Sequence, residues 1–279
     1  MIPSTHPDAT LAFDAAQAAA KLIRARRAEY NLEALGVEHK SSSVDPVTVV
    51  DKESEQLIAT CLREYEPEVA ILGEESQAGG SHSGNRRWIV DPIDGTVNFL
   101  YDSQAYAVSI ALEVAGAIEV GVVCDVPADT TYLAVRDEGA WRFSHGQWQR
   151  VSCSQPKSLA STLVATGFSY VSSRRDTQGE LLAHLLGQVR DIRRFGSAAL
   201  DLCRVAEGSV DAYYEHGLNP WDFAAGSLIA AEAGAVCTVP TLDTFGDQPA
   251  LLCAAAPSIA QELAALLPQD LKKESISTA

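Results

Sequence analysis

The first part of the chain carries two apolar patterns with helical spacing. Residues 9–27 are rich in alanine, and their apolar positions fall on one face of a helix, which predicts an opening helix. A second helix is indicated by the apolar series within residues 57–65, with Thr48 or Asp51 in the position of its N-cap. We therefore expect two helices before the first strand.

Strand patterns follow. Short apolar runs at residues 69–72 and 88–90 lead into acidic residues, as when a buried strand ends at a site. Residues 106–135 consist of apolar, strand-like stretches separated by breaks at residues 115–116 and 127–129, a pattern typical of antiparallel hairpins. Trp141 and Trp148 are expected to extend the same sheet.

After Ser152 the chain alternates between helical and strand patterns, and this change is the one candidate boundary. We interpret residues 1–151 as an N-terminal α+β half with most of the candidate metal ligands, and residues 152–279 as a C-terminal α/β half, together forming one catalytic unit. Helices are predicted near residues 178–189, 198–206, 221–233 and 259–267, and strands near residues 210–214, 235 and 251.

Composition narrows the range of partners. The 279 residues include 21 Lys and Arg against 37 Asp and Glu, a net charge of −16, which disfavours nucleic acid and anionic membranes as partners. The six cysteines occur singly, as in a reduced protein, and no signal peptide or membrane span is evident. We expect a cytoplasmic protein. A small anionic substrate requires cations or backbone amides to neutralise it locally.

Three separated segments supply candidate acids: residues 73–76 with Glu74, residues 91–96 with Asp91 and Asp94, and Trp221 with Asp222. Each alone has an ordinary explanation, as a solvated loop, a turn or a helix cap. In combination they indicate a cation, because packed carboxylates repel one another unless a metal neutralises them. Magnesium prefers such oxygen ligands.

The residues between these acids suggest roles in a two-metal site. Asp91 is the natural bridging carboxylate, and Ile93 can contribute only its backbone carbonyl. The amides of Gly95 and Thr96 at a helix start can bind phosphate. The Thr96 hydroxyl can orient a water molecule, with Glu74 as the proton acceptor.

Other polar residues are weaker candidates. His216 is close to Asp222 in sequence, but we interpret it as a loop histidine, and the other five histidines lack the spacing of a zinc site. Lys40 could orient phosphate from a flexible loop. The pairs Arg174-Arg175 and Arg193-Arg194 could clamp phosphate, but we expect them on a solvated or interface surface.

These motifs resemble the inositol monophosphatase family. Residues 88–99, WIVDPIDGTVNF, are similar to its first signature, and residues 221–226, WDFAAG, with residues 230–235, are similar to its C-terminal motif. Residues 40–51 look like its N-terminal loop, and residues 201–214 fit the stretch before the second signature. The similarity extends from about residue 10 to residue 265.

The resemblance implies a layered αβαβα sandwich of the sugar phosphatase type, usually a homodimer, activated by two or three magnesium ions and inhibited by lithium. It implies that Asp51 accepts a hydrogen bond from Thr96, that residues 196–199 line the substrate pocket and that Glu215 binds substrate hydroxyls. Val97, Ser197 and Pro220 depart from common family residues at the rim. Carried over by position, the resemblance implies three sets of site residues: the metal ligands Glu74, Asp91, Ile93, Asp94 and Asp222; the catalytic residues Glu74, Thr96 and Asp51; and the substrate residues Gly95, Thr96, Ser197, Ala198, Glu215 and Asp222.

The expected activity is magnesium-dependent hydrolysis of inositol monophosphate. Histidinol phosphate, fructose 1,6-bisphosphate and 3′-phosphoadenosine 5′-phosphate are alternative substrates. The nucleotide phosphatases of the family tend to carry lysine and glutamate after the Asp-Gly-Thr triplet, whereas this chain has residues 97–99, VNF, which favours the inositol side. A different class of function, a regulatory or binding protein that keeps the fold, also remains open.

Overall fold

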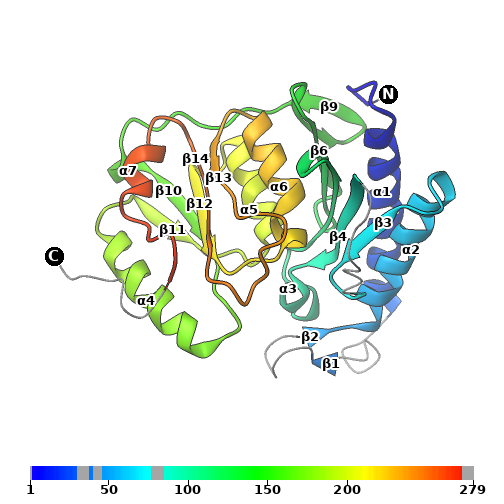
Figure 1. The fold of residues 1–279 in the computed structure, drawn as a ribbon. Coiled ribbons are helices and arrows are strands. Elements are labelled where there is room, and N and C mark those ends of the chain that lie inside the picture. Colours follow the sequence, from blue (N-terminus) through cyan, green and yellow to red (C-terminus); the bar gives the residue numbers. More distant parts are fainter. Residues whose placement is uncertain (1, 30–37, 40–45, 77–84, 272–279) are drawn as a thin grey trace.

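The computed structural model describes residues 2–29, 38–39, 46–76 and 85–271. Two long helices, α1 (Pro7–Glu29) and α2 (Val49–Tyr65), lie together on one face of a large sheet (Figure 1). The buried face of α1 consists mostly of alanines, which allow the helix to approach the sheet closely. Between the helices, β1 (Glu38–His39) and β2 (Pro46–Val47) pair antiparallel.

The large sheet has seven strands in the order β3-β4-β5-β6-β7-β8-β9. β3 runs parallel to β4, and every later pair is antiparallel, which the hairpin pattern predicted for residues 106–135. The predicted break at residues 115–116 is a tight turn in which Ala115 and Gly116 both have positive φ. The strands are β3 (Ala70–Gly73), β4 (Arg86–Asp94), β5 (Ala107–Val114), β6 (Ala117–Asp125), β7 (Thr130–Val135), β8 (Gly139–Ser144) and β9 (Gln147–Arg150).

The described residues after β9 form a five-stranded sheet in the order β11-β10-β12-β14-β13, together with four α-helices. Its strands are β10 (Leu163–Thr166), β11 (Asp191–Arg193), β12 (Ala212–His216), β13 (Val236–Thr238) and β14 (Leu251–Ala255). The helices are α4 (Ser172–Leu186), α5 (Ala198–Glu207), α6 (Pro220–Glu232) and α7 (Ala260–Ala264), with a 3-10 turn η1 (Leu159–Ser161) before β10. The short helix α3 (Thr96–Leu100) follows β4.

These elements form five layers (Figure 1). The order is α1 and α2, the seven-stranded sheet, α5 and α6, the five-stranded sheet, and α4 with α7. Each of the four spaces between layers holds its own cluster of buried apolar side chains. The predicted αβαβα sandwich is therefore confirmed. The proposed division near Ser152 remains a prediction. In the structure, α5 and α6 pack against both sheets and so connect the two parts.

Several predicted boundaries were wrong. α4 begins at Ser172, well before the predicted residue 178, because its polar first turns have no apolar period. α7 covers only Ala260–Ala264 of the predicted residues 259–267. His216 is not in a loop: it is the last residue of β12, its side chain is buried, and its Nε2 lies 2.8 Å from the Pro268 carbonyl oxygen. Among the described residues, no helix is long and apolar enough to cross a membrane.

Candidate active site

A cavity of about 1140 Å³ is lined by residues from both parts of the chain. The predicted catalytic residue Asp51 does not line the cavity. It is fully buried and accepts a hydrogen bond from Thr96, which does line it. The structure thus brings together acids that are up to 148 positions apart in sequence. The lining includes Glu74, Asp91, Ile93, Asp94, Gly95, Thr96, Ser197, Ala198, Glu215 and Asp222.

Glu74 and the two aspartates meet because β3 and β4 are parallel neighbours that end at the same edge of the sheet. β4 is longer than predicted and extends through Asp94, since Asp91 still pairs with Ser109 and Asp94 with Ala107. The register shifts between them, which accommodates Pro92 and its missing N–H group. Both carboxylates therefore belong to an irregular strand end that lines the cavity.

Gly95 allows the chain to turn sharply from β4 into α3. Its φ of +94° lies in the left-handed region, and a Cβ there would come within 2.8 Å of the Ala105 carbonyl oxygen and 3.1 Å of the Gly196 carbonyl oxygen. A residue with a side chain would therefore force these backbones apart. The close approach holds the start of α3 against the segment that leads into α5.

Two helix starts bring in the acids and hydroxyls of the C-terminal part. Ser197 is the N-cap of α5, and its hydroxyl donates to Asp94 Oδ2 at 2.5 Å, while the Ala199 amide donates to the same oxygen at 2.7 Å. Asp222 lies in the first turn of α6, and its Oδ2 atom accepts a hydrogen bond from the backbone N–H of Asn219 at 2.7 Å, as part of a capping box. The caps thus set the positions of two candidate metal ligands.

A buried chain of hydrogen bonds lies behind Thr96. The Thr96 hydroxyl is 3.1 Å from Asp51 Oδ1 and 3.1 Å from the Ile93 carbonyl oxygen, and Thr48 donates its hydroxyl and its amide to Asp51 Oδ2 at 2.5 Å and 2.9 Å. The contact between Asp51 and Thr96 that the resemblance implied is present. Thr48 is the N-cap of α2 and Asp51 completes its capping box. Asp51 therefore fixes the start of α2 and orients Thr96.

Glu215 lies on β12 across the cavity from these acids. It accepts a 2.6 Å hydrogen bond from the Tyr213 hydroxyl, and a Cβ on Gly167 would lie 1.8 Å from its Oε2 atom. Gly167 therefore leaves the space that this carboxylate occupies. Burial raises the pKa of Glu215 to about 7, and Arg194 opposes that rise.

The face of α2 that carries Asp51 also carries Glu55, a residue that was not predicted from the sequence. Glu55 is buried, and its two oxygens accept the amides of Glu75 at 2.8 Å and Ser76 at 2.9 Å. Glu55 and Asp51 are one helical turn apart, together with apolar Ile58 and Leu62 on the buried face. An acid on an otherwise apolar helix face was the signal that could have identified Glu55.

We expect Glu55→Gln to destabilise the protein and to weaken activity. The amide side chain has one acceptor oxygen in place of two, so one backbone N–H in the turn after Glu74 loses its partner, at a cost of about 1–3 kcal/mol. Chemical denaturation measures this cost. Glu53→Gln on the same helix, which alters a half-exposed ion pair with Arg26, serves as the matched control. Equal stability of the two variants would contradict the role of Glu55.

The arginine pairs are only partly as expected. Arg194 is exposed as expected, but it is exposed to the cavity, where a phosphate clamp is the less favoured of the two interpretations of this pair. Arg174 is half-buried, and its guanidinium donates to the carbonyl oxygens of Gly246 at 2.6 Å and Asp247 at 2.9 Å, so it is held by the protein in addition to being partly solvated. It supports one wall of the cavity. Lys40 lies outside the described residues.

The acids in the cavity are electrostatically unfavourable without a cation. Burial raises the pKa of Asp94 to about 6, although Ser197 and Ala199 stabilise its charged form. Burial, followed by repulsion from Glu74 and Asp94, holds the pKa of Asp222 well above its usual range. A divalent cation would remove this penalty, because it interacts favourably with the ionised form of each acid.

The donor set fits magnesium. It consists of carboxylate oxygens and one backbone carbonyl, the hard ligands that magnesium prefers, usually with only one or two carboxylates for each ion and water for the rest. Within the described ranges, no three His, Cys, Asp or Glu side chains are already gathered in the arrangement of a metal site. The carboxylates share a cavity, and water or substrate oxygens would complete the coordination.

Comparison with known proteins identifies the family. The profile of the inositol monophosphatase family matches residues 5–272. The chain belongs to this family. The resemblance deduced from the motifs is thereby confirmed. Membership of this family supports a phosphatase function for the chain.

Curated relatives in the family carry two kinds of name. Inositol-1-monophosphatase SuhB of Mycobacterium tuberculosis (strain ATCC 25618 / H37Rv) is 46% identical over 268 residues, covering 92% of each chain. Nus factor SuhB of Escherichia coli (strain K12) is 38% identical over 232 residues, covering 83% of this chain and 84% of its own. The solved structure of Mycobacterium tuberculosis SuhB superposes with a TM-score of 0.80 at 41% identity, covering 95% of this chain and 97% of that one.

Proposed function

We propose that this protein is a magnesium-dependent phosphomonoesterase that hydrolyses inositol monophosphate to inositol and phosphate. The observation that carries the proposal is the convergence of Glu74, Asp91, Asp94 and Asp222 with the Thr96 hydroxyl in one cavity. A relative named inositol-1-monophosphatase at 46% identity supports this choice of substrate. Histidinol phosphate, fructose 1,6-bisphosphate and 3′-phosphoadenosine 5′-phosphate are the alternatives within the same chemistry.

Glu74, Asp91, the Ile93 carbonyl, Asp94 and Asp222 would hold two or three magnesium ions. Bound there, magnesium would lower the pKa of the attacking water and neutralise charge on the phosphate and the leaving oxygen. In this proposal the protein's own residues bind, orient and move protons, and no phosphoenzyme forms.

Thr96 would orient the attacking water. Asp51 is an acceptor for the Thr96 hydroxyl hydrogen, so a lone pair of that oxygen can accept a hydrogen bond from water. Glu74, also on the cavity wall, would take the proton. The Gly95 and Thr96 amides would bind phosphate oxygens, and Ser197 and Ala198 would shape the pocket around the substrate. Glu215 would accept hydrogen bonds from the substrate hydroxyls.

A panel assay of phosphate release tests the substrate and the metal together. We expect inositol monophosphate to give the highest kcat/KM of the four candidates in magnesium, and a chelator to abolish turnover. Release that is unaffected by the chelator would overturn the metal-dependent mechanism. Failure to release phosphate from any of the four would overturn the proposed activity.

The role of Thr96 has its own test. Thr96→Val keeps the shape but removes the hydroxyl, so we expect kcat to fall by about 10²–10⁴-fold with little change in KM. Thr96→Ser restores the hydroxyl and should recover most of the rate. Thr130→Val, at a buried threonine outside the cavity lining, is the control. A Thr96→Val enzyme with nearly normal kcat would rule out this role.

A second candidate function is binding to a macromolecular partner, since relatives at 38–40% identity are named Nus factor SuhB. Under this alternative, size-exclusion and pull-down experiments should yield a stable stoichiometric complex that forms without magnesium. A purified protein that remains uncomplexed while it hydrolyses phosphomonoesters would favour the enzyme. The cytoplasmic location, the homodimer and the inhibition by lithium remain predictions.

A further inference from the structure

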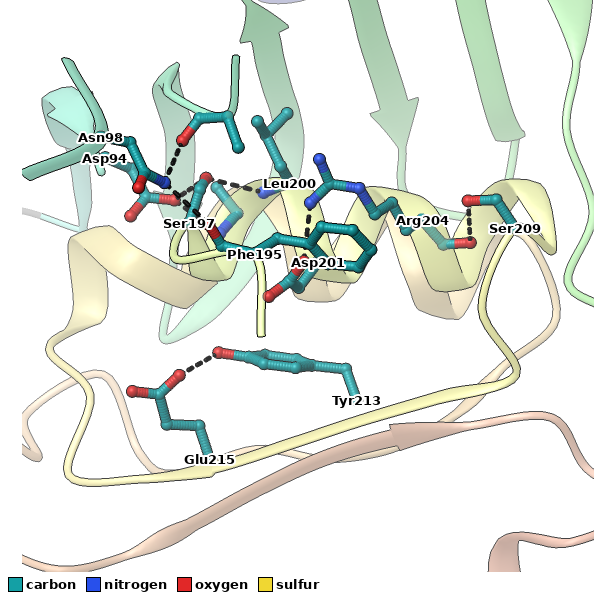
Figure 2. Close-up of polar contacts among 12 residues, drawn as sticks. Asp94, Asn98, Phe195, Ser197, Leu200, Asp201, Arg204, Ser209, Tyr213 and Glu215 are labelled. Atoms are coloured by element: carbon teal, nitrogen blue, oxygen red, sulfur yellow. Dashed lines mark hydrogen bonds and ion pairs between the residues drawn. The ribbon is translucent and has the colours of Figure 1, made fainter. Parts of the chain in front are cut away.

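The side chain of Asn98 joins two segments that are far apart in the sequence. Its Nδ2 atom donates to the Ala105 carbonyl oxygen at 2.7 Å and to the Phe195 carbonyl oxygen at 2.8 Å. Both hydrogens of the amide are therefore used, one on each side (Figure 2). Asn98 lies on α3, directly after the turn that carries Asp94 and Gly95.

The Phe195 contact matters because the 195–197 segment leads into α5. Ser197 ends that segment, and its hydroxyl donates to Asp94 Oδ2, as does the Ala199 backbone N–H in the first turn of the helix. A shift of the 195–197 segment would move both donors together. The orientation of the Asp94 carboxylate therefore depends on where this segment lies.

Phe195 is also held through its ring. The Arg204 guanidinium carbon lies 4.1 Å from the ring centroid, and Arg204 Nη1 donates to the buried Asp201 Oδ1 at 2.7 Å. Asn98 therefore restrains the Phe195 backbone, and Arg204 restrains its side chain (Figure 2). Asp201 and Arg204 both belong to α5, so the ring is tied to the helix that Ser197 caps.

Gly95 and Asn98 contact the same two backbone segments, at residue 105 and at residues 195–196. A Cβ on Gly95 would collide with the carbonyl oxygens of Ala105 and Gly196, and Asn98 binds these same two segments, at Ala105 and Phe195. Asn98 therefore ties together the two backbones that enclose the start of α3.

We propose that Asn98 is a positioning residue: it holds the 195–197 segment so that Ser197 and Ala199 orient Asp94 for divalent metal binding. The inference rests on the proposed function only in taking Asp94 as a metal ligand. Asn98 itself does not line the cavity and is not assigned contact with substrate or metal.

The sharpest variant is Asn98→Asp, which keeps the size of the side chain but replaces two donated hydrogens with an acceptor facing two carbonyl oxygens. We expect the Kd for Mn²⁺, measured by electron paramagnetic resonance on the full chain, to rise by about 10–100-fold. Ser197→Ala should change it in the same direction. Gln104→Ala is the matched control, because the side-chain amide of this exposed residue donates to the nearby Asp102 carbonyl oxygen, and it should leave the Kd within about twofold.

A double-mutant cycle separates positioning from general stability. If Asn98 acts through Ser197, the double variant should bind Mn²⁺ little more weakly than the weaker single variant, whereas independent effects would multiply. Asn98→Ser, which is too short to reach both carbonyls, carries the same expectation if Asn98→Asp does not fold. A folded Asn98 variant with wild-type Mn²⁺ affinity, or fully multiplicative effects, would overturn the proposal.

These outcomes are distinct from a failure of the proposed function. A wild-type protein that binds Mn²⁺ but releases phosphate from no substrate would overturn the activity and leave the role of Asn98 measurable by affinity. An active wild type whose Asn98 variants bind Mn²⁺ normally would overturn the positioning role alone. A lower melting temperature with unchanged affinity would show a purely structural residue and would also overturn it.

Discussion

Asp94→Asn is expected to reduce kcat/KM by more than about 100-fold, since even residues that only support metal ligands typically contribute 10–100-fold. The substitution keeps the size of the side chain and one oxygen that can accept from Ser197 or Ala199. It also removes a buried charge, so the melting temperature without metal should stay the same or rise. Phosphate release and thermal unfolding measure the two effects.

Asp129→Asn is the control for this variant, because Asp129 is exposed and forms an ion pair with Arg24 away from the cavity. It should leave both activity and stability nearly unchanged. An Asp94→Asn protein with close to normal kcat/KM in magnesium would remove Asp94 from the proposed mechanism. Loss of activity together with loss of folding would leave Asp94 a structural role only.

The second large effect is a pH-dependent loss of stability in the absence of divalent cations. The folded pKa of Asp94 is raised from 3.8 to about 6, and that of Asp222 is raised well above 3.8. Because the folded state binds these protons more tightly than the unfolded chain, the penalty is absent below about pH 4 and grows as the pH rises through 6. Magnesium should remove most of it.

Asp222→Asn isolates this effect. Without metal, the variant should be more stable than the wild type at pH 7, and the difference should shrink as the pH falls toward 4, since the wild-type acid is then protonated. Each kcal/mol relieved corresponds to about 2–4 °C in Tm for a chain somewhat shorter than this one. Magnesium should stabilise the wild type more than the variant. A stability difference that is independent of pH would contradict the repulsion.

The sequence by itself determined the family, the layered fold class and the candidate acids, which the structure brings to one cavity. This was possible because the motif around Asp91 and Asp94 is local: a strand, a proline and a glycine turn are specified by neighbouring residues. Helical and strand periods likewise predicted most elements, because burial of one face imposes a period on the chain. The polar start of α4 and the short α7 lacked such a period, and their bounds were wrong.

Only the tertiary structure decided which distant residues meet. Glu55 holds the turn after Glu74, Asn98 binds the Phe195 carbonyl, and His216 is the buried last residue of a strand. The helical pattern marks Glu55 as an acid on an apolar face, but the partners of these three residues have no local sequence signal. The raised pKa of Asp222 likewise depends on burial and on acids from another part of the chain. Such contacts arise from the packing of two sheets around α5 and α6, and neighbouring residues in the sequence do not specify them.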